Sequence, residues 1–129
     1  MRSREWTRVL MLAAAGLCVT VQGCSSPGGD IETVVVGGDA ERGRVALDGF
    51  GCGACHLIPG VTGARGMVGP PLAQFALRSY IAGQLPNQPD NLLRWLQDPP
   101  AIEPGTAMPD LGVTPAVARD MAAYLYTLR

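Results

Sequence analysis

Apolar side chains recur every three or four positions in three segments between residues 39 and 129, which is the spacing of an amphipathic helix. The first segment follows Asp39, whose short acidic side chain suits a helix N-cap. One face of this segment carries small or apolar residues, namely Ala40, Gly43, Leu47 and Phe50. The sequence therefore predicts a helix that begins directly after Asp39.

Two further helices are predicted toward the C-terminus. Pro89 suits the first position of a helix that runs through Trp95 and stops at Asp98, because two prolines follow. Thr114 and Pro115 form the same kind of start for the last helix. The apolar stripe of that last helix is Val117, Met121, Leu125 and Leu128.

The stretches between these helices are less regular. A short helical stretch is expected from Leu72 to Ile81, and four prolines make the stretch from Pro99 to Pro109 an irregular but stiff loop. No stretch resembles a strand ladder. The predicted fold class is therefore all-α, with three main helices, short helical segments and irregular loops.

The N-terminal part of the chain follows a different pattern. Three arginines within the first eight residues precede an apolar stretch from Val9 to Val21 that is too short to span a membrane comfortably. A basic start, a short apolar run and small residues are typical of a secretory signal. We therefore predict a signal peptide over residues 1–23 and an exported protein.

The residues around Cys24 resemble a bacterial lipoprotein box, Val21-Gln22-Gly23-Cys24, in which the cysteine becomes the lipid-bearing first residue of the mature chain. Gln22 is larger and more polar than the residue usually found there, so ordinary cleavage near Gly23 or Ser26 stays open as an alternative. We expect lipid attachment at Cys24 and a lipoprotein anchored to the membrane on the periplasmic side.

Residues 24–38 are rich in Ser, Pro, Gly and Asp, which predicts a flexible tether ahead of one folded domain, residues 39–129. The chain has no lysine, and after removal of residues 1–23 seven arginines face ten acidic residues. We expect such a domain to bind no nucleic acid. Its docking on protein partners should rely on apolar contact or on tethering.

The motif Cys52-Gly53-Ala54-Cys55-His56 is the attachment signature of a c-type haem. Two thiols on one turn can bond to the two vinyl groups of a single porphyrin, and the following histidine can donate a nitrogen to the iron. His56 is the only histidine of the chain, so the other axial ligand cannot be an imidazole. The sequence predicts one haem c, covalently bound through Cys52 and Cys55.

Other interpretations of the motif are weaker. A zinc site needs about four ligands, and Cys52, Cys55 and His56 supply three. A disulfide between the two cysteines would close a very small loop and stabilise little. A thioredoxin-like dithiol would call for a strand and helix around the motif, which the pattern does not show, yet a redox dithiol remains the main alternative.

Met108 lies in the stiff proline-rich loop, well downstream of the haem motif. A methionine held on such a loop is the expected source of a sulfur for the sixth coordination position. Methionine is more commonly a core-filling residue, which explains Met121 in the apolar stripe of the last helix. Met67, among glycines, is the remaining rival. We predict His56 and Met108 as the two iron ligands.

Together these motifs resemble those of the class I cytochromes c, monohaem proteins with a His/Met-ligated iron. The resemblance covers nearly all of residues 39–129, with the motifs in the same order. They are an N-terminal helix, Cys-x-x-Cys-His from Cys52, Gly-Pro-x-Leu from Gly69, Leu-x-x-Trp-Leu-x-x-Pro from Leu92, Pro-Gly-Thr-x-Met from Pro104, and a C-terminal helix. The resemblance implies a class I cytochrome c fold wrapped around one covalent haem.

The resemblance also implies roles for single residues. The carbonyl of Pro70 is expected to accept a hydrogen bond from the far nitrogen of His56, which fixes the tautomer of the ring. Trp95 takes the place of an aromatic that packs beside the methionine ligand, and Thr106 belongs to the haem-binding Pro-Gly-Thr-x-Met motif. The stretch from Ile81 to Asn87 further resembles the cytochrome c domain fused to subunit II of some haem-copper oxidases.

With both iron positions filled, small-molecule substrates are kept out, so the sequence predicts a one-electron carrier and not an enzyme. The expected donor is a protein such as a quinol-oxidising complex, and the expected acceptor a haem-copper oxidase of a respiratory chain. The alternative is a haem-bearing subunit of a dehydrogenase or a peroxidase-like haem enzyme. A peroxidase usually needs a distal base, and no second histidine exists to serve as one.

Overall fold

The computed structural model describes Val35 and residues 37–129. The predicted signal peptide, the lipid attachment at Cys24 and most of the predicted tether lie outside the described residues. Val35, which the sequence assigned to the tether, is buried in the core with 7% of its surface exposed. The packed core therefore includes a residue that precedes Asp39.

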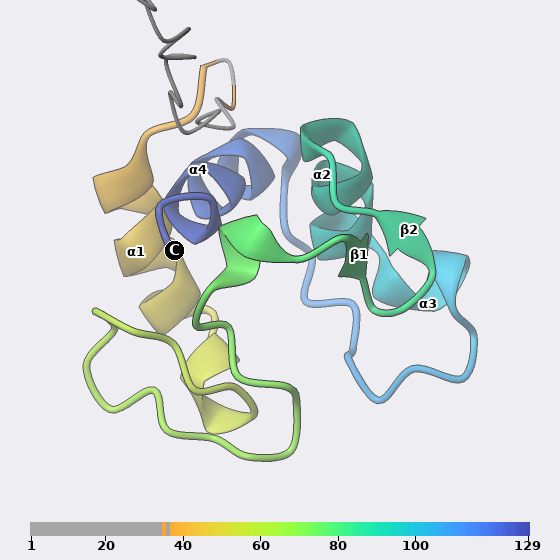
Figure 1. Cartoon of the computed structure of the whole chain (residues 1–129), viewed down its shortest axis with the longest axis horizontal. Helices are drawn as coiled ribbons and strands as arrows, with labels where there is room; N and C mark the ends of the chain where they lie inside the picture. Colours follow the sequence, from red (N-terminus) through yellow and green to blue (C-terminus); the bar gives the residue numbers. More distant parts are fainter. Residues whose placement is uncertain (1–34, 36) are drawn as a thin grey trace, which may run out of the picture. The chain divides into compact units, whose positions relative to one another are not determined.

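Helices, short 3-10 turns and one hairpin follow one another along the described residues. They are α1 (Ala40–Gly49), η1 (Cys52–Ala54), η2 (Phe75–Leu77), β1 (Tyr80–Ile81), β2 (Leu85–Pro86), α2 (Pro89–Gln97), α3 (Pro99–Ile102) and α4 (Pro115–Leu125). Figure 1 shows α4 between α1 and α2, with the long loops after η1 and after α3 on the same side of these helices. None of the helices in this described part is long and apolar enough to cross a membrane.

The contact between α1 and α4 joins the two ends of the domain. Asp39 caps α1 by accepting from the Arg42 backbone N–H at 2.8 Å. Asp120 of α4 accepts from the Asp39 N–H at 2.8 Å and from the Arg42 guanidinium at 2.8 and 2.9 Å. These bonds lower the pKa of Asp120. A Cβ at Gly43 would collide with the Asp120 carbonyl, so the two helices touch backbone to backbone.

The predicted starts of the other two main helices agree with the structure. Pro89 and Pro115 occupy the first positions of α2 and α4, and Thr114 accepts a long hydrogen bond of 3.4 Å from the Val117 N–H. Both helices bury one face in the core. The buried residues are Leu92, Trp95 and Leu96 of α2, and Ala118, Met121, Ala122 and Leu125 of α4.

The start of the proline-rich stretch is helical, and the prediction of an irregular loop was wrong there. Pro99 and Pro100 form the first turn of α3, where a helix needs no N–H donors. The Asp98 side chain caps the turn by accepting from the Ala101 N–H at 3.0 Å. The proline pair therefore ends α2 and begins α3 at the same point.

The helical stretch predicted up to Ile81 is only the single turn η2, and an antiparallel hairpin of β1 and β2 follows it, with Ile81 opposite Leu85. Ala82 and Gly83 turn the hairpin with φ angles of 50° and 72°, and the Gln84 N–H donates to the Ile81 carbonyl at 3.0 Å. The prediction of no strands was wrong here. Alanine is rare in the left-handed region, so the turn left little sequence signal.

Candidate haem-attachment site

The Cys-x-x-Cys-His motif lies on η1 and the two residues that follow it. Gly51 turns the chain out of α1 with a φ of 72°, and the His56 N–H donates to the Cys52 carbonyl at 3.0 Å, which closes one turn. Both thiols are free; Cys52 is half-buried and Cys55 is exposed. Burial raises the pKa of the Cys52 thiol. The turn thus carries both thiols, with no disulfide between them.

The imidazole of His56 is held through one of its nitrogens. Nδ1 lies 2.8 Å from the carbonyl oxygen of Pro70, and because a carbonyl only accepts, Nδ1 carries the proton of the neutral ring. Nε2 then keeps its lone pair, which is the state of a metal-binding histidine. Gly69 lies against the ring, and a Cβ at this position would come within 2.6 Å of Nδ1.

Two glycines fix the loop after His56 onto the thiol turn. The N–H groups of Gly66 and Gly69 donate to the carbonyls of Gly53 and Cys55 at 3.0 and 2.8 Å. A side chain at Gly66 would collide with the backbone of Ala54 and Cys55. Sequence reasoning did not assign a role to Gly66 or Gly69, although a glycine on each side of an apolar pair was a signal for a close backbone approach.

Arg78 is a second residue that sequence reasoning missed. Its guanidinium donates to the carbonyls of Pro71 and Ala73, the latter at 3.2 Å, and lies 5.6 Å from the ring centroid of Phe75. These bonds hold the segment directly after Pro70, whose own carbonyl faces His56. A lone arginine after an apolar stretch gives no such signal in the sequence.

The three candidate methionines lie in different environments. Met108 is half-buried and packs against the core, and its N–H donates to the Thr106 Oγ1 at 3.1 Å. Met67 is 92% exposed and Met121 only 1% exposed. Trp95, the predicted neighbour of the methionine ligand, is buried in α2. Of the three, only Met108 has a side chain that is partly buried, whereas Met67 is exposed to solvent and Met121 is enclosed by the core.

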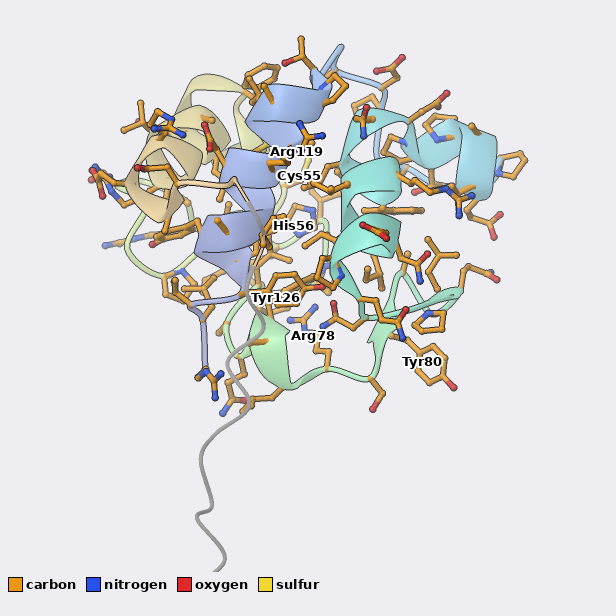
Figure 2. The ribbon with its side chains drawn as sticks, turned by 90° about the horizontal axis from the view of Figure 1, so that it is seen from above. Cys55, His56, Arg78, Tyr80, Arg119 and Tyr126 are labelled. Carbon is orange, nitrogen blue, oxygen red and sulfur yellow. The ribbon has the colours of Figure 1, made fainter. Side chains whose placement is uncertain are left out.

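The predicted ligands come from two separate loops. In Figure 1 the loop after η1 lies below α1 and the loop after α3 lies below α2, both on the same side of α4. Figure 2, which views the molecule from above, shows His56 in projection between the ribbons of α4 and α2. The arrangement places the His56 loop and the Met108 loop on one side of the helices.

The residues present fit a covalently bound haem. Two free thiols, a histidine with an unshared Nε2 and a glycine where a Cβ would meet the ring are the features that such a group needs. A cavity of about 450 Å³ lies within the loop of residues 57–65, and its lining includes none of the predicted site residues. Among the residues that the structure describes, no group of three or more His, Cys, Asp and Glu side chains is placed to hold a metal ion.

Comparison with known proteins gives relatives of one kind. The chain is 36% identical over 70 residues to cytochrome c oxidase subunit 2 of Alkalihalophilus pseudofirmus (strain OF4), which covers 54% of the chain and 20% of that protein. It is 37% identical over 59 residues to cytochrome c oxidase subunit 2 of Bacillus sp. (strain PS3), which covers 44% of the chain and 17% of that protein. The chain is thus similar to an oxidase subunit 2 over about half of its length.

The chain spans about a fifth of the length of these curated relatives. No protein-family model and no solved structure matches it. The two relatives support the resemblance to an oxidase subunit 2. The class I cytochrome c fold and the haem ligands stay predictions.

Proposed function

We propose that this protein is a one-electron carrier with a single haem c, attached through Cys52 and Cys55 and ligated by His56 and Met108. The observation that carries the proposal is the 2.8 Å contact between Nδ1 of His56 and the carbonyl of Pro70. In the neutral ring this contact places the proton on Nδ1 and leaves the lone pair of Nε2 available, and the ring directly follows the two cysteines of the motif. A histidine of a structural core would have no need of this combination.

The two proposed iron ligands and the residues that position them come from two loops. The Pro70 carbonyl accepts a hydrogen bond from Nδ1 of His56 and so fixes the orientation of the ring. Thr106 holds the backbone N–H of Met108, which restricts where the sulfur points. When bound, a haem supplies an iron that alternates between the ferrous and ferric states, and a His/Met ligand pair raises its potential. Because both ligands come from the chain, small substrates are kept from the metal.

The similarity to cytochrome c oxidase subunit 2 supports a role in respiratory electron transfer to a terminal oxidase. We propose that the acceptor is a haem-copper oxidase and the donor a protein such as a quinol-oxidising complex. We also propose export to the periplasmic side and anchoring through a lipid on Cys24. The absence of lysine from the sequence supports docking by apolar contact or tethering in place of a ring of positive charge.

The test of the proposal is haem staining on a denaturing gel after expression with a haem-attachment system. The parent chain should retain its haem through denaturation, because two thioethers hold it. Cys52→Ala combined with Cys55→Ala should lose the stain at equal protein load. Haem that leaves the parent under denaturing conditions would overturn covalent attachment.

The same preparation separates a carrier from a haem enzyme. If His56 and Met108 both bind the iron, the reduced parent should bind carbon monoxide slowly and turn over no peroxide. Rapid carbon monoxide binding together with peroxidase activity in the parent would show an open iron position. The peroxidase-like interpretation would then replace the carrier.

A further inference from the structure

Glu103 connects the methionine loop to the β-hairpin. Its Oε2 accepts from the Gln84 side-chain amide at 2.8 Å, and its Oε1 accepts from the Gly105 N–H at 3.1 Å. Its backbone carbonyl accepts from the Thr106 N–H at 2.9 Å. A single residue thus binds the hairpin on one side and the two residues that lead to Met108 on the other.

The hydrogen bonds of Gly105, Thr106 and Met108 described above all run within the loop itself. Pro104 and Pro109 add no N–H donors of their own. The bond between Gln84 and Glu103 differs, because it joins positions 19 residues apart and belongs to two separate elements. This bond relates the position of the loop to the hairpin and not only to its own backbone.

We propose that the Glu103 carboxylate is a positioning group for Met108, which holds the methionine loop to the hairpin by accepting from Gln84 and Gly105 at once. The proposal rests on the proposed function, in which Met108 is an iron ligand. A carboxylate suits this task because both of its oxygens accept hydrogen bonds, whereas an amide has one acceptor and two donors. Substitutions of Gln84 should therefore have different effects according to the charge that they introduce.

The experiment measures the rate at which cyanide binds to the oxidised, haem-loaded protein, since cyanide enters only when the sulfur leaves the iron. Glu103→Gln removes the negative charge, so the bonds to Gln84 and Gly105 lose their charge assistance, and Gln84→Glu places two carboxylates against each other. Each should raise the cyanide rate by about three- to tenfold, the scale of one net hydrogen bond at an exposed site. Gln84→Lys, which replaces the bond by an ion pair, should stay within about twofold of the parent.

Two further measurements separate positioning from general loosening. High salt should relieve the effect of Gln84→Glu, because it screens the repulsion, and it should leave the parent unchanged. Asp110→Asn is the matched control: it removes a carboxylate from the same loop, one whose Oδ1 accepts from the Gly112 N–H at 2.8 Å. This control should leave the cyanide rate at that of the parent.

The outcomes decide between the two proposals. If the parent shows the weak long-wavelength band of sulfur-ligated ferric haem but Glu103→Gln and Gln84→Glu bind cyanide as slowly as the parent, Glu103 has no positioning role. An equal acceleration in Asp110→Asn would also refute it, since any loss of charge would then suffice. If the parent holds no haem or lacks the sulfur band, the proposed function itself fails and the role of Glu103 falls with it.

Discussion

The three methionines illustrate how burial separates side chains of one type. Met67 lies almost fully in solvent, Met121 is enclosed by the core of α4, and Met108 is half-buried on a loop. A sulfur that binds a metal has to be held in one position, but it must not be fully enclosed by the side chains of the core. Only the environment of Met108 meets both conditions among these three.

Substitution of each methionine by alanine should therefore give three distinct results. Met108→Ala should abolish the sulfur band of the oxidised protein and lower the reduction potential, because the axial sulfur is lost. Met121→Ala should keep the band but reduce the free energy of unfolding by about 2–5 kcal/mol, as expected for a large buried side chain. Met67→Ala should leave both quantities near those of the parent. A band that disappears in Met67→Ala and persists in Met108→Ala would assign the ligand to the other loop.

Tyr126 is a buried phenol whose hydroxyl donates to the Asn87 Oδ1 at 2.9 Å. Burial raises its pKa to about 12 from an ordinary value of 10.0. A raised pKa means that the stabilisation is complete below pH 10 and is lost as the pH rises from 10 toward 12, because the unfolded chain ionises first.

Tyr126→Phe should consequently lose about 1–3 kcal/mol of unfolding free energy at neutral pH, since the Asn87 oxygen is left without this donor. The difference between parent and variant should narrow between pH 10 and 12. Denaturant titrations at several pH values measure both effects. A gap that stays constant across this range would show that the phenol ionises equally in both states.

At the residue scale the sequence points to the residues of the motif but not to the residues that support them. Cys52, Cys55 and His56 are adjacent in the chain, so a motif alone identifies them. Arg78 and Glu103 act through hydrogen bonds to positions that only the folded chain brings near. No local pattern contains that information, and these residues were missed for this reason.

At the scale of elements, the close contact of α1 with α4 depends on one small residue. Gly43→Ala would push a methyl group into the backbone of α4, with the Met121 nitrogen at 2.9 Å. We expect the two helices to separate and the free energy of unfolding to fall by about 1–3 kcal/mol or more, as in other overpacked contacts.

Gly49 of the same helix supplies the control for that substitution. A Cβ at Gly49 meets no atom within 4 Å, and alanine favours a helix over glycine by about 0.5–1 kcal/mol. Gly49→Ala should therefore match or exceed the stability of the parent in a denaturant titration. Equal unfolding midpoints for the two glycine variants would contradict a backbone contact at Gly43.

The elements that the sequence predicted well are those with strong caps and a clear apolar face. α1, α2 and α4 begin at Ala40, Pro89 and Pro115, each directly after its predicted cap or as the predicted first residue. The hairpin and α3 were missed because each is short and its signal is ambiguous. An alanine in the sequence does not usually indicate a left-handed turn, and a proline pair more often ends a helix than begins one.

At the scale of the whole molecule, the predicted anchor lies outside the described residues, at Cys24. If Cys24 carries lipid, Cys24→Ser should move the protein from the membrane fraction to the soluble exported fraction, because several acyl chains anchor stably where one does not. The measurement is cell fractionation followed by haem staining. Identical fractionation of parent and variant would favour simple cleavage or an uncut anchor.

The hydrogen bond between Asp39 and Asp120 spans 81 positions of the chain, so α1 cannot make this contact until α4 has been synthesised. Closing a loop of that length costs about 4 kcal/mol of chain entropy. Cys52 and Cys55 lie inside this loop. Until the ends of this loop meet, both thiols belong to an open chain. Under the proposed function, this open chain is the state in which an enzyme would reach both thiols to attach a haem.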